Sequence, residues 1–377
     1  MSRPRSRSRR GSDVRVLVMC TVHDPRDARI SERQIAALLA AGHTVTQAGP
    51  FTAFGATSMP GVQAIDLPRA HGRHRVRAWR AARRLLRRTA SEYDVILIHS
   101  PELIPAAVGL DHTAVVWDVH EDTASTLAMK SWLPQALRGP IAAVVRRAEA
   151  SAERRAHVML AERAYAERFA LVHPVVPNTP MMPAQVVPSS PGRAIYVGSL
   201  TAARGVHDLI DVGRRLSEQG EIRLDVIGPA APAIAADMRA AQAQGWLTWR
   251  GFIPNAEALR LMDGATVGLS LLHDEPNYRH SMPTKLLEYL ARGIPFISTP
   301  LPLAVGLATA SGGGIIVPFG DAAATAQAVR TLHDDDRGRQ TLADQGHAWV
   351  VEHADWGRDG PAFVAQLEEW AATRPRP

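Results

Sequence analysis

Two ionisable side chains, Lys285 and Glu288, lie three positions apart in the stretch NYRHSMPTKLLEYLARGIPFIS, which runs from residue 277 to residue 298. The apolar residues around them have helical spacing, and Pro283 suits a first helical turn, so the pattern predicts a helix that Ser281 caps. A lysine near a helix N-terminus is unfavourable for the helix alone because both are positive, and an anion bound between them reverses this sign. The alternative is a surface ion pair between the two side chains, worth roughly a few tenths of a kcal/mol.

A second candidate anion site lies in the stretch YVGSLTAARGVHDLI. A strand is predicted to end just before Gly198, which lets the backbone turn closely, and a helix opens at Gly205. Backbone N–H groups at that helix start, with Arg204 beside them, suit phosphate oxygens. Because the glycine spacing is neither a dinucleotide fingerprint nor a Walker loop, an ordinary strand–turn–helix connection is the alternative. We favour a diphosphate bound by Arg204 and Lys285, with Glu288 accepting hydrogen bonds from ribose hydroxyls.

The elements that must position these residues are predicted from short apolar runs separated by helical patterns, which indicate parallel sheets covered on both faces. The first half contains VRVLVM, TVTQAG, VQAIDL, VILIHS, AVVWDVH and HVMLA. After a proline-dense stretch the pattern restarts with AIYVGSL, RLDVIGP, LTWRGF, VGLSLL, PFIST and GIIVPF. Two doubly wound domains bind ligands outside the carboxyl ends of their strands, so we expect the site in a cleft that the two domains share.

The predicted domain organisation has five parts, with a proline- and serine-rich linker that acts as a hinge for closure on the substrate. They are a disordered basic arm at 1–12, a first Rossmann-like domain at 13–182, the linker at 183–192, a second Rossmann-like domain at 193–350, and a C-terminal amphipathic helix at 351–377 that packs back on the first domain.

The composition narrows the class of protein. A chain of 377 residues with 46% hydrophobic and 21% charged residues is typical of a globular protein of two domains. No apolar run is long enough to span a membrane, and the first residues lack the apolar core of a secretory signal. The single cysteine, Cys20, excludes disulfides within the chain and suits a reducing cytoplasm. Acids at metal-ligand spacing with a histidine partner are not evident, so we predict no metal site.

Nine of the arginines lie between Arg69 and Arg88. Val76, Trp79 and Leu86 are predicted near the opposite side of the helix from a stripe formed by Arg73, Arg77, Arg80, Arg84 and Arg87. Such a basic amphipathic helix is a surface for anionic lipid or an anionic acceptor, or simply a solvated face. A nucleic-acid-binding function is disfavoured, because the chain has few aromatic residues and two predicted ligand-cleft domains.

Several motifs carry a resemblance to a known family. YVGSL with the following RG, VIGP, RGFIPNAEALRLMDGATVGLSLL and NYRHSMPTKLLEYLARGIPFIST resemble the donor-binding half of retaining GT-B nucleotide-sugar glycosyltransferases of the large fourth sequence family, the glycosyl transferases group 1. HDPRDARISERQIAALLAAGHTV, YDVILIHSPELIPAA and VVWDVHEDTASTLAMKSWLP resemble its acceptor-side domain. The resemblance implies an α/β fold with two Rossmann-like doubly wound parallel-sheet domains facing a central cleft. It also implies transfer of a sugar from a nucleotide diphosphate sugar to an acceptor hydroxyl with retention of anomeric configuration, in polysaccharide, glycolipid or glycoconjugate biosynthesis.

In the donor half, the resemblance is carried over position by position. Such enzymes have two acids eight positions apart, and Glu288 matches the second, which binds ribose, whereas His280 replaces the first. Ser199 replaces one diphosphate-binding arginine, Arg204 matches the other basic position, and Lys285 matches a lysine found in a branch of the family. The diphosphate is thus expected on Gly198, Ser199, Arg204 and Lys285. The donor sugar is expected on Glu275, Asn277, His280 and Ser281, with Asp274 as a further acid able to substitute.

In the first half, His120 resembles the histidine that such enzymes place against the donor sugar and the reacting centre; the alternative is a structural histidine or polar surface. With Arg204 and Lys285 it completes the expected catalytic set. The acceptor side is expected to involve His23, Asp24, Asp27, His99 and Glu121, of which Glu121 could instead orient His120. An Asp27–Arg29 structural pair is the alternative at the first of these loops.

The implied mechanism needs no protein nucleophile, because a leaving phosphate oxygen takes the proton of the attacking hydroxyl while Arg204 and Lys285 stabilise the departing charge. No cofactor is implied beyond the nucleotide-sugar co-substrate, for which uridine is preferred over guanosine. The acceptor is a sugar, a lipid-linked group or a small molecule, and peripheral contact with an anionic inner membrane face would use Arg73–Arg88. A non-catalytic nucleotide-sugar-binding relative and a nucleotide-sugar epimerase are the alternative functions.

Overall fold

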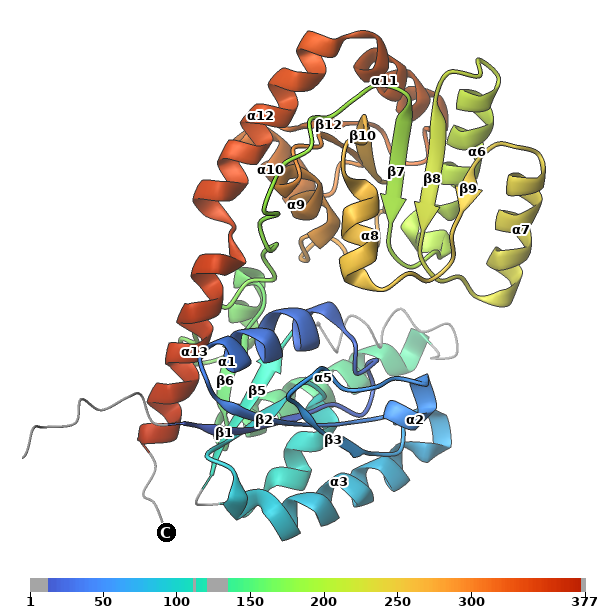
Figure 1. Cartoon of the computed structure of the whole chain (residues 1–377). Helices are drawn as coiled ribbons and strands as arrows, with labels where there is room; N and C mark the ends of the chain where they lie inside the picture. Colours follow the sequence, from blue (N-terminus) through green and yellow to red (C-terminus); the bar gives the residue numbers. More distant parts are fainter. Residues whose placement is uncertain (1–12, 111–112, 121–134, 374–377) are drawn as a thin grey trace, which may run out of the picture. The chain divides into compact units, whose positions relative to one another are not determined.

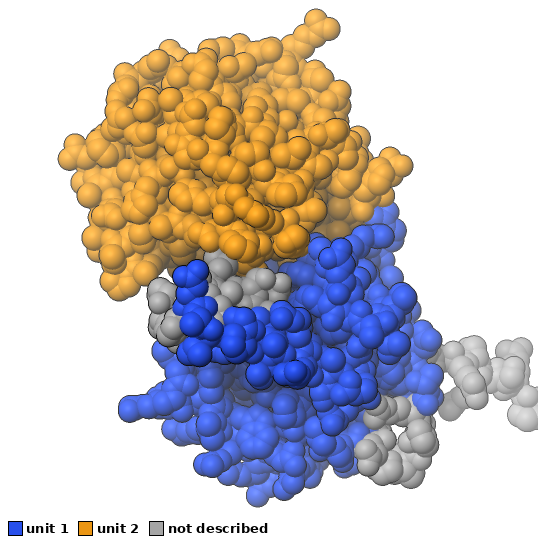
Figure 2. Space-filling view, turned by 180° about the vertical axis from the view of Figure 1, so that it is seen from behind, with its two compact units in different colours: residues 1–177, 358–377 blue, residues 178–357 orange. Residues whose placement is uncertain are grey.

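The computed structural model describes residues 13–110, 113–120 and 135–373. The chain forms two compact units, one of Met1–Pro177 with Arg358–Pro377 and the other of Asn178–Gly357, which are coloured separately in Figure 2. Each unit contains a six-stranded sheet whose strand pairs are all parallel (Figure 1). The predicted arm at 1–12 lies outside the described residues.

The first unit is built on the sheet order β3-β2-β1-β4-β5-β6. Its central strands are mostly apolar because both faces of the sheet are covered there, and every residue of β4 and β5 is buried, whereas the edge strand β3 is largely exposed. Each strand coincides with a predicted apolar run: β1 Arg15–Met19, β2 Thr44–Gly49, β3 Gln63–Asp66, β4 Val95–Ile98, β5 Ala114–Val119 and β6 His157–Leu160.

Helices cover both faces of this sheet. On one face, an apolar cluster joins α3 and η4 to β1 and β4, and a second cluster joins α5 and η5 to β5 and β6. On the other face, Arg29 of η1 contacts Asp118 of β5. The helices are the π-helical segment η1 Ala28–Ile35 continued by α1 Ala36–Ala40, then α2 Phe51–Phe54, α3 Arg75–Thr89 and α5 Gln135–Glu153, with the shorter 3-10 segments η2 Gly72–His74, η3 Ala90–Glu92, η4 Pro101–Ala107 and η5 Arg163–Arg168.

Helix α3 is the predicted arginine-rich helix, but its buried face differs from the prediction. Ala78, Ala82 and Leu86 are buried at intervals of four residues and pack on the sheet. Val76, predicted on the side opposite the arginines, is 56% exposed and lies among them, so this part of the prediction is wrong. Val76 lies two positions from Ala78, about 200° around the helix, so it points away from the buried face.

The second unit has the sheet order β12-β11-β10-β7-β8-β9. Its strands again match the predicted runs: β7 Arg193–Val197, β8 Arg223–Ile227, β9 Thr248–Trp249, β10 Val267–Ser270, β11 Phe296–Ser298 and β12 Gly314–Ile316. One apolar cluster lies under α6, α7 and α11, and another lies under α8, α9, α10 and α12. The helical elements are η6 Ala202–Arg204, α6 Val206–Ser217, α7 Pro232–Ala243, α8 Asn255–Met262, α9 Thr284–Ala291, α10 Pro302–Ser311, α11 Ala322–Asp334 and α12 Asp336–His353.

The last helix, α13 Trp356–Ala372, begins at the end of the second unit and belongs to the first from Arg358 onward. Its C-terminal part is anchored there by two side-chain contacts. His157 of β6 stacks on Trp370 with ring centres 4.7 Å apart, and His43 Nε2 lies 3.1 Å from a carboxylate oxygen of Glu368. None of the described helices is long and apolar enough to cross a membrane.

Candidate functional site

Each sheet has a topological switch point beside its first strand. There the strands that follow in the chain are added first on one side of that strand and then on the other. In the first unit β1 lies between β2 and β4, and in the second unit β7 lies between β8 and β10. Ligands of doubly wound sheets bind outside the carboxyl ends of the strands at such points. The predicted site residues that the structure describes lie after these strands or in the loops and helix starts beside them, and the two units are described in turn.

In the second unit, Gly198 follows β7 and adopts φ +140°, a conformation that favours glycine. A Cβ at this position would lie 3.0 Å from Lys285 Nζ and 3.5 Å from the Tyr196 hydroxyl oxygen. The glycine is therefore required both by the backbone and by the closeness of the lysine. Its neighbour Ser199 is exposed and accepts a hydrogen bond from the Tyr196 hydroxyl at its carbonyl oxygen, 3.0 Å away.

Lys285 is the second residue of α9, nearer the helix start than predicted, and it is half-buried. Its Nζ is buried, lies 3.7 Å from the centre of the Tyr196 ring, and has no hydrogen-bond partner among the described residues. Burial, together with the nearby charge of Arg204, lowers the pKa of Lys285 well below its ordinary value. Glu288 is buried too, at 7% exposure, so the surface ion pair between Lys285 and Glu288 is not formed.

Arg204 ends the short 3-10 segment η6, whose cap Thr201 accepts a hydrogen bond from the Arg204 backbone N–H. The following Gly205 has φ +76°, and a Cβ there would lie 2.0 Å from the carbonyl oxygen of Leu271, so the loop packs directly on the end of β10. The guanidinium of Arg204 lies 5.9 Å from the centre of the Tyr278 ring. No described carboxylate pairs with it, and the structure thus brings two cations to one edge of the sheet.

The loop between β10 and α9 carries the residues predicted to bind the donor sugar. His280 is exposed, and Glu275, Asn277 and Ser281 are half-buried. The predicted capping role of Ser281 is wrong: α9 begins at Thr284, Pro283 is the N-cap residue, and no side chain caps the helix.

Asp274, the further acid considered for the donor sugar, is already engaged. Its two carboxylate oxygens accept hydrogen bonds from Nε and Nη2 of Arg279, each at 2.7 Å. Arg279 lowers the pKa of this carboxyl below its ordinary value. The neighbouring His273 is held in the same way, with Nε2 2.7 Å from Asp208 of α6.

In the first unit, the centre of the site is a residue that was not predicted, Asp118 of β5. Its buried carboxylate accepts hydrogen bonds from Arg29 Nε at 2.8 Å and Arg29 Nη2 at 2.7 Å, and from Gln34 Nε2 at 3.1 Å. Burial alone would raise the pKa of Asp118, but the Arg29 guanidinium holds it well below the ordinary range. The one signal in the sequence was an acid inside an otherwise apolar strand, which needs a buried partner.

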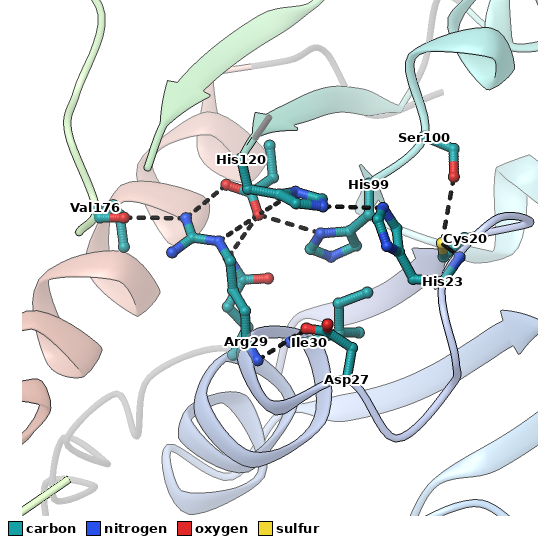
Figure 3. A network of polar contacts seen from close by, with 11 residues as sticks. Cys20, His23, Asp27, Arg29, Ile30, His99, Ser100, His120 and Val176 are labelled. Carbon is teal, nitrogen blue, oxygen red and sulfur yellow. Dashed lines mark hydrogen bonds and ion pairs between the residues drawn. The ribbon is translucent and has the colours of Figure 1, made fainter. Parts of the chain in front are cut away.

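Two histidines, His99 and His120, lie beside Asp118, and a third, His23, lies against His120. Figure 3 labels the three histidines. The Nδ1 atoms of His99 and His120 lie 3.1 and 3.6 Å from Asp118 Oδ2, and His120 Nε2 lies 3.1 Å from Nε2 of His23. The hydrogen bonds of the parallel sheet bring the ends of β1 and β4 to the same edge, since the His99 backbone N–H donates to the carbonyl oxygen of Met19. Burial lowers the pKa of His99; for His120, burial acts in the same direction but Asp118 outweighs it and raises the pKa.

The remaining predicted residues of the first unit have other partners. The Asp27 carboxylate caps η1 by accepting the backbone N–H groups of Arg29 and Ile30. The alternative of an Asp27–Arg29 side-chain pair is not formed, because the guanidinium pairs with Asp118 and donates to the Val176 carbonyl oxygen at 2.9 Å. Asp24 forms an ion pair with Arg26 at 2.8 Å. Glu121 lies outside the described residues.

His99, Asp118 and His120 are close enough to be considered as metal ligands, because one ligand atom of each lies within 4.8 Å of the others. However, Asp118 already accepts three hydrogen bonds from Arg29 and Gln34. A cation bound here would be repelled by the buried Arg29 charge. The geometry therefore fits a hydrogen-bonded histidine cluster better than a metal centre.

Comparisons with known proteins agree with this architecture. Residues 191–335, less than half of the chain, match the family Glycosyl transferases group 1. The chain is 29% identical over 192 residues to the putative colanic acid biosynthesis glycosyltransferase WcaL of Escherichia coli (strain K12), covering 50% of this chain and 47% of that protein. The Salmonella typhimurium protein of the same description is 31% identical over 143 residues, 37% of this chain and 35% of the relative. The chain thus spans about half or less of the curated relatives it matches.

Solved structures resemble the chain over nearly its whole length. Sucrose-phosphate synthase from Thermosynechococcus elongatus has a TM-score of 0.73 at 16% identity, covering 95% of this chain and 99% of that one. Anabaena Alr3699/HepE, solved in complex with UDP-glucose, has a TM-score of 0.69 at 14% identity, covering 94% and 100%. WaaG, a glycosyltransferase involved in lipopolysaccharide biosynthesis, has a TM-score of 0.66 at 16% identity, covering 93% and 99%.

At these identities the structural likeness shows the fold alone. It confirms the predicted α/β class with two Rossmann-like parallel-sheet domains, the GT-B architecture. The match at 191–335 covers the strands and helices that carry Gly198, Arg204 and Lys285. The family match and the fold together support a GT-B glycosyltransferase.

Proposed function

We propose that this protein transfers a sugar from a nucleotide diphosphate sugar, preferably a UDP-sugar, to an acceptor hydroxyl with retention of anomeric configuration. The observation that carries the proposal is the buried amine of Lys285, which has no described hydrogen-bond partner and shares a sheet edge with Arg204. Burial and the Arg204 charge disfavour the protonated amine of Lys285, and an anion bound between the two side chains reverses this effect. A diphosphate supplies such an anion. The match to glycosyl transferases and the UDP-glucose complex of a structural neighbour support this choice of ligand.

The roles of the residues follow from their chemistry. Lys285 and Arg204 bind the diphosphate and stabilise the charge that develops as it leaves. Gly198 leaves room for the phosphate oxygens because it has no side chain, and Glu288 at the next turn of α9 binds the ribose hydroxyls. His280, exposed in the loop before α9, contacts the donor sugar.

The experiment that tests this proposal is a thermal-shift screen against UDP, GDP, ADP, dTDP and their sugars. One nucleotide is expected to stabilise the protein in a saturable manner, because a ligand that binds only the folded state adds RT ln(1 + [L]/Kd) to the unfolding free energy. Lys285→Ala should remove this shift. Arg223→Ala, which removes an exposed arginine at the amino end of β8, should retain it. A folded protein that no nucleotide stabilises would contradict the proposal.

A non-catalytic nucleotide-sugar-binding protein is the second candidate. It is favoured by the engagement of Asp274 with Arg279, which leaves His280 in place of an acid at the expected sugar contact. Release of UDP from the matching UDP-sugar, measured with and without added acceptor sugars, separates the two. Nucleotide binding without release of UDP under any condition would favour the binding protein.

The acceptor is proposed to be lipid-linked and met by peripheral contact of the first unit with an anionic membrane. Pro68, Val76 and Ala81 line a hollow on α3 together with Arg73, Arg77, Arg80 and Arg84. None of these arginines forms an ion pair with a described residue, so the surface has a net positive charge around an exposed valine. That combination suits an interface with anionic lipid.

Flotation with vesicles of anionic or zwitterionic phospholipid tests this contact. The protein is expected to float with anionic vesicles at low salt, and a variant with Arg77, Arg80 and Arg84 changed to glutamine should not. A control variant with Arg223, Arg239 and Arg260 changed to glutamine removes three exposed charges from the second unit. Equal flotation of both variants would contradict the use of this surface.

A further inference from the structure

Strands β7 and β10 of the second unit are neighbours in the sheet along only part of their length (Figure 1). Their pairing ends at Ile195 and Gly268. Beyond these residues each strand continues along its other neighbour, β7 beside β8 as far as Val197 and β10 beside β11 as far as Ser270. The two strands therefore separate at the topological switch point of this sheet, where the ligands of such folds bind.

The side chain of Tyr289 from α9 fills the place where these strands separate. A Cβ at Gly268 would lie 2.3 Å from Cγ and Cδ2 of the Tyr289 ring, and a glycine inside a strand often marks such a close approach. The Tyr289 hydroxyl oxygen accepts a hydrogen bond from the Val197 backbone N–H at 3.2 Å. The same hydroxyl donates to the carbonyl oxygen of Leu269 at 3.2 Å. One side-chain hydroxyl thus joins β7 to β10 where their own pairing has ended.

This bridge is closed to water. Tyr289 has 0% exposure, and burial raises the pKa of its hydroxyl above the ordinary value, so the hydroxyl keeps the hydrogen that it donates. If the hydroxyl were removed, the N–H of Val197 would lose this acceptor and the carbonyl of Leu269 would lose this donor. Backbone groups that lose a partner inside the protein destabilise the arrangement that leaves them so.

The bridge lies next to the proposed anion site. Lys285 is four positions before Tyr289 in α9, so the two side chains leave the same side of the helix. Val197, which donates to the Tyr289 hydroxyl, directly precedes Gly198, and a Cβ at Gly198 would lie 3.0 Å from Lys285 Nζ. The hydroxyl therefore joins α9 to the residue beside the glycine that the lysine amine approaches.

The path of the lysine side chain depends on the separation of the strands. Side chains alternate between the two faces of β7, so Ile195 packs with Tyr289 in the apolar cluster under α9, while Tyr196 packs in the cluster under α6 and α11. The amine of Lys285 comes from α9, yet it lies 3.7 Å from the centre of the Tyr196 ring. It thus reaches from one face of the sheet toward the other at the carboxyl end of β7.

We propose that the Tyr289 hydroxyl is a positioning group of the anion site, which holds α9 against the end of β7 so that the Lys285 amine stands beside Gly198. The inference rests on the proposed nucleotide-sugar binding and adds a residue to it. Because the hydroxyl is fully buried between the strands, it acts on the donor through Lys285. Its removal is therefore expected to weaken nucleotide binding more than its effect on stability explains.

Thr266 offers a matched control, because its hydroxyl joins the same two strands at their amino ends. Its Oγ1 accepts the Arg193 backbone N–H at 2.9 Å and donates to the Ser190 carbonyl oxygen at 2.7 Å. Thr266 has 0% exposure as well. Tyr289→Phe and Thr266→Val each remove one buried hydroxyl with little change of shape. Both variants are therefore expected to lower the urea midpoint of unfolding to a similar extent.

The first test needs no ligand, because the chain contains only two lysines, Lys130 and Lys285. Protein with ¹³C-labelled lysine gives two sets of side-chain signals in NMR spectra, and Lys285→Met identifies the set that belongs to Lys285. An aromatic ring shifts the signals of nuclei above its face, so those of Lys285 should differ from the signals of free lysine. Tyr289→Phe is expected to move them toward the free values, whereas Thr266→Val should not. Unmoved signals in folded Tyr289→Phe protein would overturn the positioning role.

The second test measures the Kd of UDP by isothermal titration calorimetry for the wild type and both variants. Tyr289→Phe is expected to raise the Kd roughly 10–100-fold, the range seen when groups that orient metal ligands are removed. Thr266→Val should leave the Kd close to the wild-type value. An equal loss of affinity in the two variants would overturn the proposal, because it would show an effect of stability alone.

Failure of the proposed function is recognised separately. The lysine signals report the geometry around Lys285 without a ligand, and the nucleotide screen on the wild type reports the function. A wild-type protein that no nucleotide stabilises would reject the donor site, and with it the role of Tyr289 in binding, even if the lysine signals move. Equally tight UDP binding by the wild type and Tyr289→Phe would reject the positioning role alone.

Discussion

The amine of Lys285 lies 3.7 Å from the centre of the Tyr196 ring, with no described hydrogen-bond acceptor. Contact with the ring face stabilises a protonated amine, but burial and the Arg204 charge act against protonation and lower its pKa well below the ordinary value. Tyr196 is affected as well, since burial raises the pKa of its hydroxyl to about 12. The site is thus assembled at a cost in stability that a bound anion offsets.

Replacing Lys285 by methionine is expected to stabilise the unliganded protein. Between the lowered folded pKa and the ordinary value of the unfolded chain, the unfolded state binds a proton that the folded state does not, so the lysine lowers the unfolding free energy in that range. We expect a gain of roughly 0.5–2 kcal/mol at pH 7, measured by urea unfolding, with the gain shrinking as pH rises toward the ordinary lysine value. Lower stability of Lys285→Met at both pH 7 and pH 9 would contradict this account.

Gly198→Ala should weaken nucleotide binding and also destabilise the fold. The backbone at φ +140° disfavours any side chain, and the new methyl group would contact Lys285 Nζ. The strain should cost about 1–3 kcal/mol, measured by denaturant unfolding with and without nucleotide. Gly245→Ala is the matched control: its φ of +76° is also positive, but no atom lies within 4 Å of the added methyl. Equal loss of nucleotide affinity in the two variants would show that contact with Lys285 is not the cause.

Arg29→Met should destabilise the first unit strongly. It leaves the buried Asp118 carboxylate without its bidentate partner, a change that costs about 3–5 kcal/mol in comparable buried pairs. Arg26→Met breaks the more exposed pair with Asp24, and should cost only about 0–1 kcal/mol.

The Arg29–Asp118 pair also makes the unfolding free energy depend on pH in a predictable direction. Because the folded pKa of Asp118 lies below its unfolded value, its contribution to stability is complete above the unfolded value and is lost as pH falls through the folded one. Arg29→Met raises the folded pKa, so the deficit relative to wild type should become smaller in acid. Unfolding curves measured from pH 7 to pH 3 would contradict this if the deficit stayed constant.

Cys20 should react slowly with thiol reagents in the native protein. It is 5% exposed, hydrogen-bonds with Ser100 at 3.2 Å, and has a pKa that burial raises to about 11. The thiolate is the reactive form, so little of it is present at pH 8. Labelling by Ellman's reagent should therefore follow opening of the first unit and become fast in urea. Rapid stoichiometric labelling without denaturant would contradict the burial of this thiol.

The twelve strands of the described residues coincide with predicted runs, because most strands of a doubly covered parallel sheet are apolar along their length and stand out between polar stretches. The edge strand β3 is largely exposed, and in this case the apolar run that contains it gave the prediction. The loops that carry Gly198, Arg204 and Lys285 followed from the strand ends. The proposed anion site therefore depends on local sequence features: a glycine after a strand and a lysine in the first turn of a helix.

The cluster around Asp118 was not predictable in the same way. Its members come from loops after β1, β4 and β5 and from η1, and the Arg29–Asp118 pair joins residues 89 positions apart. Sequence spacing reports neighbours on one element, and for Arg29 it offered only Asp27 as an alternative partner. The helix-start prediction at Ser281 failed for a local reason, because Pro283 itself occupies the cap position and the chain before it stays outside the helix.

The chain passes from one unit to the other twice, once at Pro177–Asn178 and again within α13, at Gly357–Arg358. A single backbone cut at the first crossing would leave two fragments, 1–177 and 178–377, of which the second still carries Glu368 and Trp370. Those side chains dock on His43 and His157 of the first fragment. The C-terminal part of α13 therefore holds the second fragment to the first through side-chain contacts. Fragments 1–177 and 178–377, expressed separately, are expected to associate through it.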